Sequence, residues 1–597
     1  MRSFLVLAGW PGIAPATGAW TGSDAAGRPL VLAYDDGTSV ASNEERTIRA
    51  VLAGALYNAR HLRAGLGDRH AVSARDDAEL VVHLYEERGI QCVKALRGAF
   101  ALALWDERLQ RFLLARDQLG LFPLYHASDD GRLAVAAALP QLAALPGVGA
   151  TRDPSALDAF LTLGTVPPPA TFYAGIRQLH PGELAVWEGG RLRTQRYWQP
   201  TFPERRVTRS DMQTLVREQT LEALRLRQAG AVAGLLLSGG IDAAALLALA
   251  TVERRLPARA YTVGEQELRT AAALAARAGV EHVAVPAVED WLGAVDAVLA
   301  AHGGPVGGRE TPVLHAAATR AAADVGVLLA GVGGEEVFGG SAPARAAERA
   351  RRYLALPGLV REAAHVCTRV TPGTWAPALR RLVEDEHLSP VERYAHAVGA
   401  VRPFDRSALY TPEMLGVLGD ARPWEPLAVL FADAVGAGAV DGADAVYYVE
   451  LVLGLPARAA AAYAAATAVD LRLPLADHRL VQFVASVPPR ARGSAWERQL
   501  LLRGAVGDLV PSAVARAPRR TPGPPRAAWP TLIEELLPAS RVAAQGFFNC
   551  ETVARLVREH LRGRRDHGAR LWAIMLATRW LERQTVAVAP VVRAAAG

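Results

Sequence analysis

A glycine turn followed by an aspartate carries the clearest chemistry in this sequence. The turn, Ser238-Gly239-Gly240-Ile241-Asp242, separates an apolar run that starts at Val232 from a stretch rich in alanine and leucine. The apolar run predicts a buried strand of a parallel sheet, and the Ala/Leu stretch predicts a helix. A strand, a glycine turn and a helix N-terminus form an anion site, because free N–H groups and the helix dipole favour negative charge. An aspartate beside such a turn suits Mg²⁺, which in turn suits phosphate oxygens.

A second glycine segment, with two carboxylates, follows another predicted strand at 325–330. Its sequence is Gly331-Val332-Gly333-Gly334-Glu335-Glu336. Glycines again allow the backbone to approach a ligand closely. The alternative for Glu336 is a carboxylate at a helix N-terminus that takes no part in chemistry.

Alternating strands and helices are expected to position these turns. Strands are predicted at 259–263 and 281–285, and helices at 211–229 and 267–278. This order predicts a doubly wound parallel α/β sheet. Ligands in such sheets bind beyond the carboxyl ends of the strands, where Ser238 is expected to lie.

The first 200 residues are expected to be rich in β-structure. Strands are predicted at 4–8, 30–34, 100–105, 111–115 and 184–187, with a helix at 77–88. Residues 199–210 contain two prolines and mixed charge, which break both periodicities and predict a linker at 201–210. Residues 341–450 are rich in Ala, Arg and Leu and are expected to be mostly helical.

The composition limits the classes of protein to which this chain can belong. A chain of 597 residues is long enough for more than one domain, and 51% hydrophobic residues allow a large core. No apolar run approaches the ~18 residues that span a bilayer, and the N-terminus lacks a signal-peptide pattern. We therefore expect a cytoplasmic enzyme with no membrane insertion. The three cysteines lie far apart in the sequence, which fits a reducing compartment.

The positive charge of the chain is almost entirely arginine. Lys94 is the only lysine, and the arginines alternate with acids, as at 380–386. Nucleic-acid binding would favour basic clusters with interleaved aromatics, so it is not expected. Any cationic role beyond residue 94 must therefore fall to Arg, His or a metal.

Both glycine segments resemble known motifs of the asparagine synthetase family. The first resembles its pyrophosphate-binding loop (PP-loop), Ser-Gly-Gly-x-Asp-Ser, with Ala243 at the last position. The second resembles Ser-Gly-Glu-Gly-Ser/Gly-Asp-Glu-Leu-Phe-Gly-Gly, with Glu335 in place of the family's metal-binding Asp. Val332 replaces a Glu that asparagine synthetases place near the incoming ammonia. Since valine can neither accept a proton nor bind ammonium, this change argues against asparagine synthesis.

The N-terminal part resembles the glutamine amidotransferase domain of the same family over 78–106 and 115–125 and on to Trp198. The resemblance implies an Ntn-hydrolase-like αββα sandwich. The family's catalytic N-terminal cysteine is missing, since residue 2 is Arg, and Ala53-Gly54-Ala55 replaces the polar Asn-Gly-Glu of the glutamine pocket. We therefore expect an inactive glutaminase-like domain at 1–200, a linker at 201–210 and an ATP-binding synthetase domain at 211–597.

The resemblance also implies a set of site residues for ATP and Mg²⁺. Asp242 and Glu335 would bind the metal. Glu336, Arg519 and Arg520 would complete the catalytic set, with the arginines replacing a phosphate-neutralising lysine. Solvated loop arginines are the alternative for the last two. The ATP contacts implied are Leu235, Leu236, Leu237, Ser238, Gly239, Gly240, Asp242, Val263, Ala330, Gly331, Gly333 and Gly334.

Further along the chain, Asp470 and Arg472 match the family's Glu-x-Arg, and a structural ion pair is the favoured interpretation.

The chemistry implied is amide formation through an acyl-adenylate, with AMP and pyrophosphate released. Relatives without a glutaminase join an internal amine to an internal carboxylate: β-lactam synthetases do so on a small molecule, and lasso-peptide cyclases do so on a peptide. We expect a lasso-peptide cyclase, whose partners would be a precursor peptide, a leader peptidase and a leader-recognition protein. The alternatives are an asparagine synthetase fed by ammonia, a β-lactam-synthetase-like cyclase and a catalytically silent binding protein.

Overall fold

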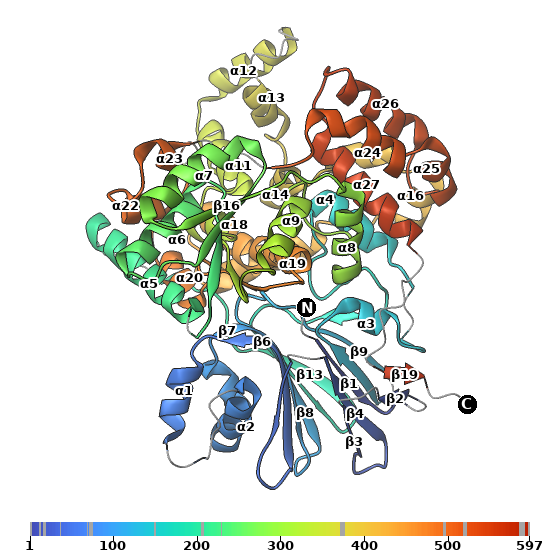
Figure 1. Cartoon of the computed structure of the whole chain (residues 1–597). Helices are drawn as coiled ribbons and strands as arrows, with labels where there is room; N and C mark the ends of the chain where they lie inside the picture. The colour runs from blue at the N-terminus through green and yellow to red at the C-terminus, as the bar shows by residue number, and fades with distance from the viewer. Residues whose placement is uncertain are drawn as a thin grey trace.

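The computed structural model describes residues 3–10, 13–15, 19–35, 38–67, 70, 76–129, 131–148, 151–203, 208–228, 230–370, 377–493, 497–517, 522–583 and 592–594. Arg519 and Arg520, two of the expected site residues, lie outside this part of the chain. Figure 1 shows a lower β-rich half, coloured blue to cyan, beneath a larger half built mostly of helices around a parallel sheet.

Two antiparallel six-stranded sheets form the N-terminal half. The first sheet runs in the order β11 (Arg177–Gln178), β9 (Tyr125–Asp129), β10 (Arg132–Ala136), β1 (Phe4–Ala8), β4 (Pro29–Tyr34) and β3 (Ala19–Ser23). The second sheet runs in the order β13 (Arg191–Arg196), β12 (Glu183–Glu188), β8 (Arg111–Arg116), β7 (Gly98–Asp106), β6 (Ile48–Leu56) and β5 (Ser39–Ser42). All five predicted strands of this half lie within observed strands.

The two sheets face each other across an apolar layer that includes Phe4 and Val6 of β1 and Trp105 of β7. The outer face of the second sheet is covered by α1 (Ala59–Leu66) and α2 (Asp77–Arg88). The first sheet packs on α3 (Leu139–Ala143) and α4 (Pro154–Leu163), and this cluster continues into the C-terminal helices. The observed order of layers is the expected αββα sandwich.

A parallel sheet of five strands organises the second half. Its order is β16 (Glu281–Val285), β15 (Arg259–Val263), β14 (Ala233–Leu236), β17 (Val327–Leu329) and β18 (Asp470–Arg472), and all four pairings are parallel. The strand expected from Val232 begins one residue later, because the Val232 side chain is 64% exposed. The fold class predicted for this half is confirmed.

Helices pack on this sheet in two groups, as Figure 1 shows. One group comprises α5 (Arg209–Gln228), α6 (Ile241–Val252), α7 (Glu265–Ala278), α20 (His478–Ala485) and α22 (Leu500–Val506). The other comprises α8 (Trp291–His302), α9 (Thr311–Ala321) and α19 (Leu455–Ala465). The short α10 (Gly334–Phe338) follows the second glycine segment.

The segment between 341 and 450 is mostly helical, as expected. It contains α11 (Ala342–Leu354), α12 (Gly358–Val370), α13 (Pro377–Glu384), α14 (Pro390–Val398), α15 (Arg406–Leu409), α16 (Pro412–Leu418), α17 (Glu425–Gly436) and α18 (Gly442–Val449). After α20 and α22 come α23 (Ser512–Arg516), α24 (Trp529–Leu536), α25 (Ala539–Gln545), α26 (Cys550–Leu561) and α27 (Gly568–Glu582), and then the short strand β19 (Val592–Ala594), which pairs with β2 (Ile13–Pro15). In Figure 1 the red helices α24–α27 gather at the upper right.

One long helix corrects an expectation from the sequence. The elements α18, the π-helical segment η4 (Glu450–Gly454) and α19 run on as one helix, Gly442–Ala465, which is long and apolar enough to cross a membrane by length and composition alone. The expectation that no stretch approaches that length was therefore wrong. Of its apolar window, 72% is buried inside the molecule, as it would be in a core helix, so packing accounts for its composition.

A buried ion-pair network joins the two halves. Asp477, at the N-cap of α20, accepts from Arg97 of the first half at 2.9 Å and from Arg227 of α5 at 3.0 Å. Asp477 is 1% exposed. Burial alone would raise the pKa of this carboxyl, but the two guanidinium groups outweigh it and lower the pKa below its ordinary value.

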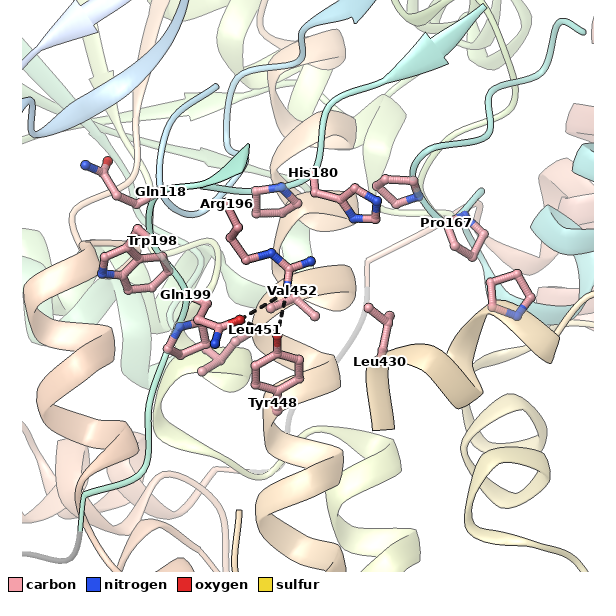
Figure 2. A pocket seen from close by; sticks show the side chains of 14 residues that line it. Gln118, Pro167, His180, Arg196, Trp198, Gln199, Leu430, Tyr448, Leu451 and Val452 are labelled. Carbon is pink, nitrogen blue, oxygen red and sulfur yellow. Dashed lines mark hydrogen bonds between the residues drawn. The ribbon is translucent and has the colours of Figure 1, made fainter. Parts of the chain in front are cut away.

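A small pocket also lies at the junction of the halves. Figure 2 shows Arg196 of β13 bonded to Gln199 and to Tyr448 of α18, with Trp198 and His180 nearby. The pocket volume is only about 20 Å³, room for about one water molecule. This junction is therefore a packed interface, and the larger cavity described below lies elsewhere.

Candidate active site

The first glycine turn joins the carboxyl end of β14 to the N-terminus of α6. Leu237 is held by two bonds, since its N–H donates to the Tyr261 carbonyl at 2.8 Å and its carbonyl accepts from Thr262 Oγ1 at 2.5 Å. Gly239 has φ +73°, a conformation that side chains disfavour. Gly240 is the N-cap of α6 and has no side chain to cap it. The first N–H groups of this helix therefore face an exposed turn and can bind an anion.

The second glycine segment lies directly against the first. A Cβ placed on Gly334 would lie 2.2 Å from Asp242 Oδ1, and one on Gly331 would lie 3.1 Å from the Ala243 backbone nitrogen. A side chain at Gly331 would clash with backbone, and one at Gly334 would displace the Asp242 carboxylate. The Asp242 carboxylate consequently abuts the backbone of Gly334, the residue before Glu335.

Side chains from residues 498 and 499 hold these two carboxylates. Gln499 Nε2 donates to Asp242 Oδ1 at 2.6 Å, and Arg498 Nη1 lies 3.4 Å from Glu335 Oε1. Gln499 is buried and adopts φ +50°. Asp242 and Glu335 line one cavity and offer hard oxygen donors beside a phosphate-binding turn, a set that fits Mg²⁺.

That cavity has a volume of about 620 Å³. Asp242 of the first glycine segment and residues 331–336 of the second line it. Apolar side chains line other parts of its wall, including Leu163 from α4 of the first half, Leu314, Leu453 and Trp572 of α27. Residues far apart in sequence therefore enclose a space that opens directly beside the predicted phosphate and metal ligands.

Acidic side chains and two arginines, Arg309 and Arg458, form much of the polar wall. Arg458 Nε lies 3.1 Å from Glu336 Oε1, and its Nη1 lies 3.4 Å from Glu310 Oε1. Burial opposes the charge of Arg458, but Glu336 and Glu310 outweigh it and raise the pKa of the guanidinium. Glu336 is 4% exposed. It is thus more than a solvent-facing carboxylate at a helix N-terminus, because it is buried and paired.

A further carboxyl, Glu450, enters the cavity from the first residue of η4. Tyr394 OH donates to Glu450 Oε1 at 2.6 Å. Burial, reinforced by the negative charge of Glu336, raises the pKa of Glu450 to about 7. A carboxyl of this pKa exchanges protons near neutral pH.

The remaining residues expected from the sequence surround the turns. Leu235 and Leu236 lie in β14, and Val263 ends the neighbouring β15. Ala330 is fully buried after β17, and its N–H donates to the carbonyl of Arg472 at 3.1 Å. Gly333, with φ +95°, is the N-cap of α10.

Asp470 and Arg472 form the structural ion pair that the sequence favoured, at 2.8 Å. The Arg472 guanidinium also lies over the ring of Tyr57 from the first half, 5.9 Å from its centroid. This pair therefore contributes to the contact between halves.

Sequence reasoning missed Tyr394, Glu450, Arg458, Arg498 and Gln499. The shortage of lysine indicated that arginine would supply charge, but it did not indicate Arg458, which lies in a helix of small residues. The π-helical segment that presents Glu450 has no sequence signature.

Comparisons with known proteins agree with this geometry. Residues 215–582 match the family model for asparagine synthase, and residues 28–198 match that for a glutamine amidotransferase domain. A Mycobacterium tuberculosis protein named provisionally as a glutamine-hydrolyzing asparagine synthetase is 28% identical over 89% of this chain and 83% of its own length. The glutamine-hydrolyzing asparagine synthetase 1 of Bacillus subtilis is 22% identical over 93% of this chain and 88% of its own.

Two further matches are partial. Amidase chry2 of Gibberella zeae is 31% identical over 34% of this chain and 31% of its own length. Among solved structures, the glutamine phosphoribosylpyrophosphate amidotransferase of B. subtilis covers 47% of this chain and 59% of its own, at 14% identity and a TM-score of 0.21, a value too low to inform the fold.

Proposed function

The chain belongs to the asparagine synthase family, as an ATP-dependent carbon–nitrogen ligase, and we propose that it closes a macrolactam on a ribosomally made precursor peptide. An oxygen of a peptide Asp or Glu side chain would attack the α-phosphorus of ATP, and pyrophosphate would leave. The peptide α-amine would then attack the activated carbonyl carbon, and AMP would leave. The peptide loses one water overall.

The cavity beside the two glycine segments is the observation that carries this proposal. Its volume of about 620 Å³ falls within the roughly 300–1,000 Å³ typical of sites for drug-sized ligands. An apolar wall that includes Trp572 and Leu453 suits the side chains of a peptide better than it suits free aspartate.

The source of the amine also favours the macrolactam proposal over amidation by ammonia. Val332 lines the cavity where asparagine synthetases have a carboxylate, so this position itself offers ammonia no acceptor. In the first half, Ser3 is buried and donates to Gln141 Oε1 at 2.6 Å, so its hydroxyl is engaged in packing. Residues 53–55 carry no polar side chain for glutamine. An amine carried by the substrate itself needs no glutaminase.

The residues of the site have distinct tasks in this reaction. The N–H groups of Gly239, Gly240 and the first turn of α6 would bind the pyrophosphate part of ATP. Asp242 and Glu335 would hold Mg²⁺, which supplies charge neutralisation for the leaving group when bound. Gln499 fixes the carboxylate of Asp242 in the required orientation. The chain's own contribution is thus positioning and electrostatics.

The proposal includes partners and a compartment. A precursor peptide would be the substrate, delivered by a leader peptidase and a leader-recognition protein in the cytoplasm. The absence of basic clusters with interleaved aromatics in the sequence supports a partner other than nucleic acid.

Amidation of aspartate with ammonia is the second candidate function, favoured by the names of the relatives. A β-lactam-synthetase-like cyclase acting on a small molecule is a third. One experiment separates the first two. A leaderless core peptide, taken from the small reading frame beside the gene, is incubated with the protein, ATP and Mg²⁺ and examined by mass spectrometry. In a parallel reaction, aspartate and ammonium replace the peptide.

The proposal predicts that the peptide loses one water as AMP forms, and that Asp242→Ala abolishes both. An unchanged peptide together with asparagine in the parallel reaction would overturn it in favour of the second function.

A further inference from the structure

We propose that Glu450 is the general base that removes a proton from the attacking amine, with Tyr394 as its positioning residue. The proposal rests on the amide-forming function proposed above and names the group that the reaction requires. The amine is cationic at neutral pH, and it attacks only after losing a proton.

The backbone places Glu450 for this task. Glu450 is the first residue of η4, the π-helical segment within the long helix from Gly442 to Ala465. Such π-segments occur frequently at functional sites, because the wider turn displaces a side chain from the regular helix face. A Cβ on Gly454 would lie 3.1 Å from Glu450 Oε1, so the glycine leaves room for the carboxylate along the helix. Both Glu450 and Tyr394 line the cavity.

The other carboxylates of the cavity are engaged differently. Asp242 accepts from Gln499, and Glu335 lies near Arg498. Glu336 and Glu310 both pair with Arg458. Glu450, in contrast, accepts its short bond from a neutral hydroxyl, that of Tyr394 on α14. It is therefore the cavity carboxylate best suited to accept a proton.

Several charged and polar groups face Glu450 and set its proton affinity. Burial and the charge of Glu336 on α10 raise its pKa, while hydrogen bonds from Tyr394 and Ser341 and the charge of Arg458 on α19 lower it. The result is a pKa of about 7. A peptide α-amine has a pKa of about 8, so transfer to Glu450 is unfavourable by only about tenfold. Transfer to an ordinary glutamate would be unfavourable by about 10³–10⁴-fold.

The step balances as follows. The ammonium nitrogen gives one proton to a Glu450 oxygen, and its freed electron pair forms the bond to the activated carbonyl carbon. The bond from that carbon to the AMP oxygen breaks, and AMP leaves with the electron pair. The second proton on nitrogen passes to solvent, and Glu450 releases its own proton before the next turnover.

Glu450→Gln tests the proposal, because it keeps the shape and removes the base. The variant should release pyrophosphate from ATP at the wild-type rate with the peptide. Ring closure should fall at least about 100-fold, so that AMP accompanies unclosed peptide. In the wild type, the rate of closure should rise through about pH 7, and the variant should lack this rise. Glu450→Asp should restore part of the rate, and Glu413→Gln, on the exposed part of α16, is the control.

Tyr394→Phe tests whether Tyr394 positions Glu450. The hydroxyl lowers the pKa of Glu450, so its removal should move the inflection of the closure rate to higher pH. A purely structural role would change stability without moving the inflection.

Failure of the base assignment is distinguishable from failure of the function. Wild-type protein that releases no pyrophosphate with any peptide would refute the function. Two results would refute the base assignment alone. In the first, Glu450→Gln closes the ring at the wild-type rate. In the second, both Glu450→Gln and Glu450→Asp lose pyrophosphate release while their melting temperatures stay unchanged.

A separate cluster in the first half carries a second inference. We infer that His70, His83 and Glu86 form a Zn²⁺ site. Glu86 Oε2 lies 3.0 Å from His83 Nδ1 and 3.7 Å from His70 Nδ1, and the three ligand atoms lie within 4.8 Å of one another. Tetrahedral Zn²⁺ with bonds of about 2.0–2.1 Å separates its ligands by roughly 3.4 Å, between these two distances.

Neighbouring side chains contact two of the three ligands, His70 and Glu86, at the atoms that would not bind the metal. Glu87 Oε1 lies 3.5 Å from His70 Nε2, the ring nitrogen that would not bind the metal. Asn43 Nδ2 donates to Glu86 Oε1 at 3.0 Å, the oxygen that would not bind it. Asn43 is itself buried and fixed by the backbone of Thr47 and Ile48. Such partners fix the ligands and raise metal affinity.

Metal analysis of the full chain tests this site. With Mg²⁺ in excess to saturate the nucleotide site, the protein should take up one Zn²⁺ per chain, and Co²⁺ should give the visible spectrum of a four-coordinate ion. His70→Asn and Glu86→Gln should each abolish uptake, while Glu413→Gln should not. Wild-type protein that takes up no Zn²⁺, or variants that keep it, would overturn the inference.

Discussion

Replacing Gly334 by alanine tests whether the contact between the two glycine segments positions the site. The added Cβ would lie 2.2 Å from Asp242 Oδ1 and 2.5 Å from its Cγ. Real Cβ atoms essentially never approach other atoms within 3.0 Å, so the carboxylate must retreat by about 0.8 Å. Gln499 holds the same oxygen at 2.6 Å, so the retreat also strains or breaks that bond.

A displacement of about 1 Å at a reacting or metal-binding group costs about 100-fold in rate. That factor corresponds to about 2.7 kcal/mol of transition-state stabilisation. The fold should tolerate the change, because alanine has a higher helix propensity than glycine in α10. We therefore expect Gly334→Ala to lose about 100-fold in peptide-dependent pyrophosphate release and to require more Mg²⁺ for ATP binding.

The assay is pyrophosphate release, paired with calorimetric titration of ATP at several Mg²⁺ concentrations. Gly326→Ala is the matched control, since a Cβ at Gly326 would meet nothing within 4 Å. If Gly334→Ala kept the rate and Mg²⁺ dependence of the wild type, Asp242 would have no role that depends on its position.

Three further outcomes are expected. Asp477→Ala should destabilise the chain by about 3–5 kcal/mol, seen as a lower denaturation midpoint, because it removes the buried carboxylate that pairs with Arg227 and leaves Arg97 with only Glu222. Because the pKa of Asp477 is lowered in the folded protein, its contribution to stability is complete above the ordinary aspartate pKa and is lost as the pH falls below that value. Asp477→Asn should therefore make the free energy of unfolding less dependent on pH in this acid range. A variant with the pH dependence of the wild type would contradict this. Trp572→Ala should raise the KM for peptide several-fold with little change for ATP, because this ring lines the cavity whereas the expected pyrophosphate-binding turn, residues 238–240, does not. Equal effects on both KM values would contradict this placement.

Local patterns predicted much of the fold. The bounds of β1, β15, β16 and α2 agree with expectation because each element has its own hydrophobic pattern and clear end signals. Val232 was placed inside a strand because its apolar character matched its neighbours, yet it lies exposed before β14. The apolar helix from Gly442 to Ala465 was missed because its charged residues interrupt any simple apolar run.

Long-range contacts limited what could be predicted of the site. The glycine turns and their carboxylates were identifiable because their chemistry is contiguous in sequence. Glu336 could not be assigned a partner, since Arg458 lies 122 residues away and comes close only through packing of α19. Likewise, the pairing of Glu450 with Tyr394 spans 56 residues and depends on a π-turn. Arg519 and Arg520 stay predictions, as they lie outside the described residues.

The central claim is that a substrate carboxylate is activated by transfer of AMP in this site. The most direct measurement uses core peptide whose Asp or Glu side chain carries oxygen-18 in the carboxylate, followed by mass spectrometry of the released nucleotide. The account predicts AMP that contains one oxygen-18 atom, together with a closed peptide that retains the other. Unlabelled AMP, or label found in inorganic phosphate with ADP as the product, would contradict it.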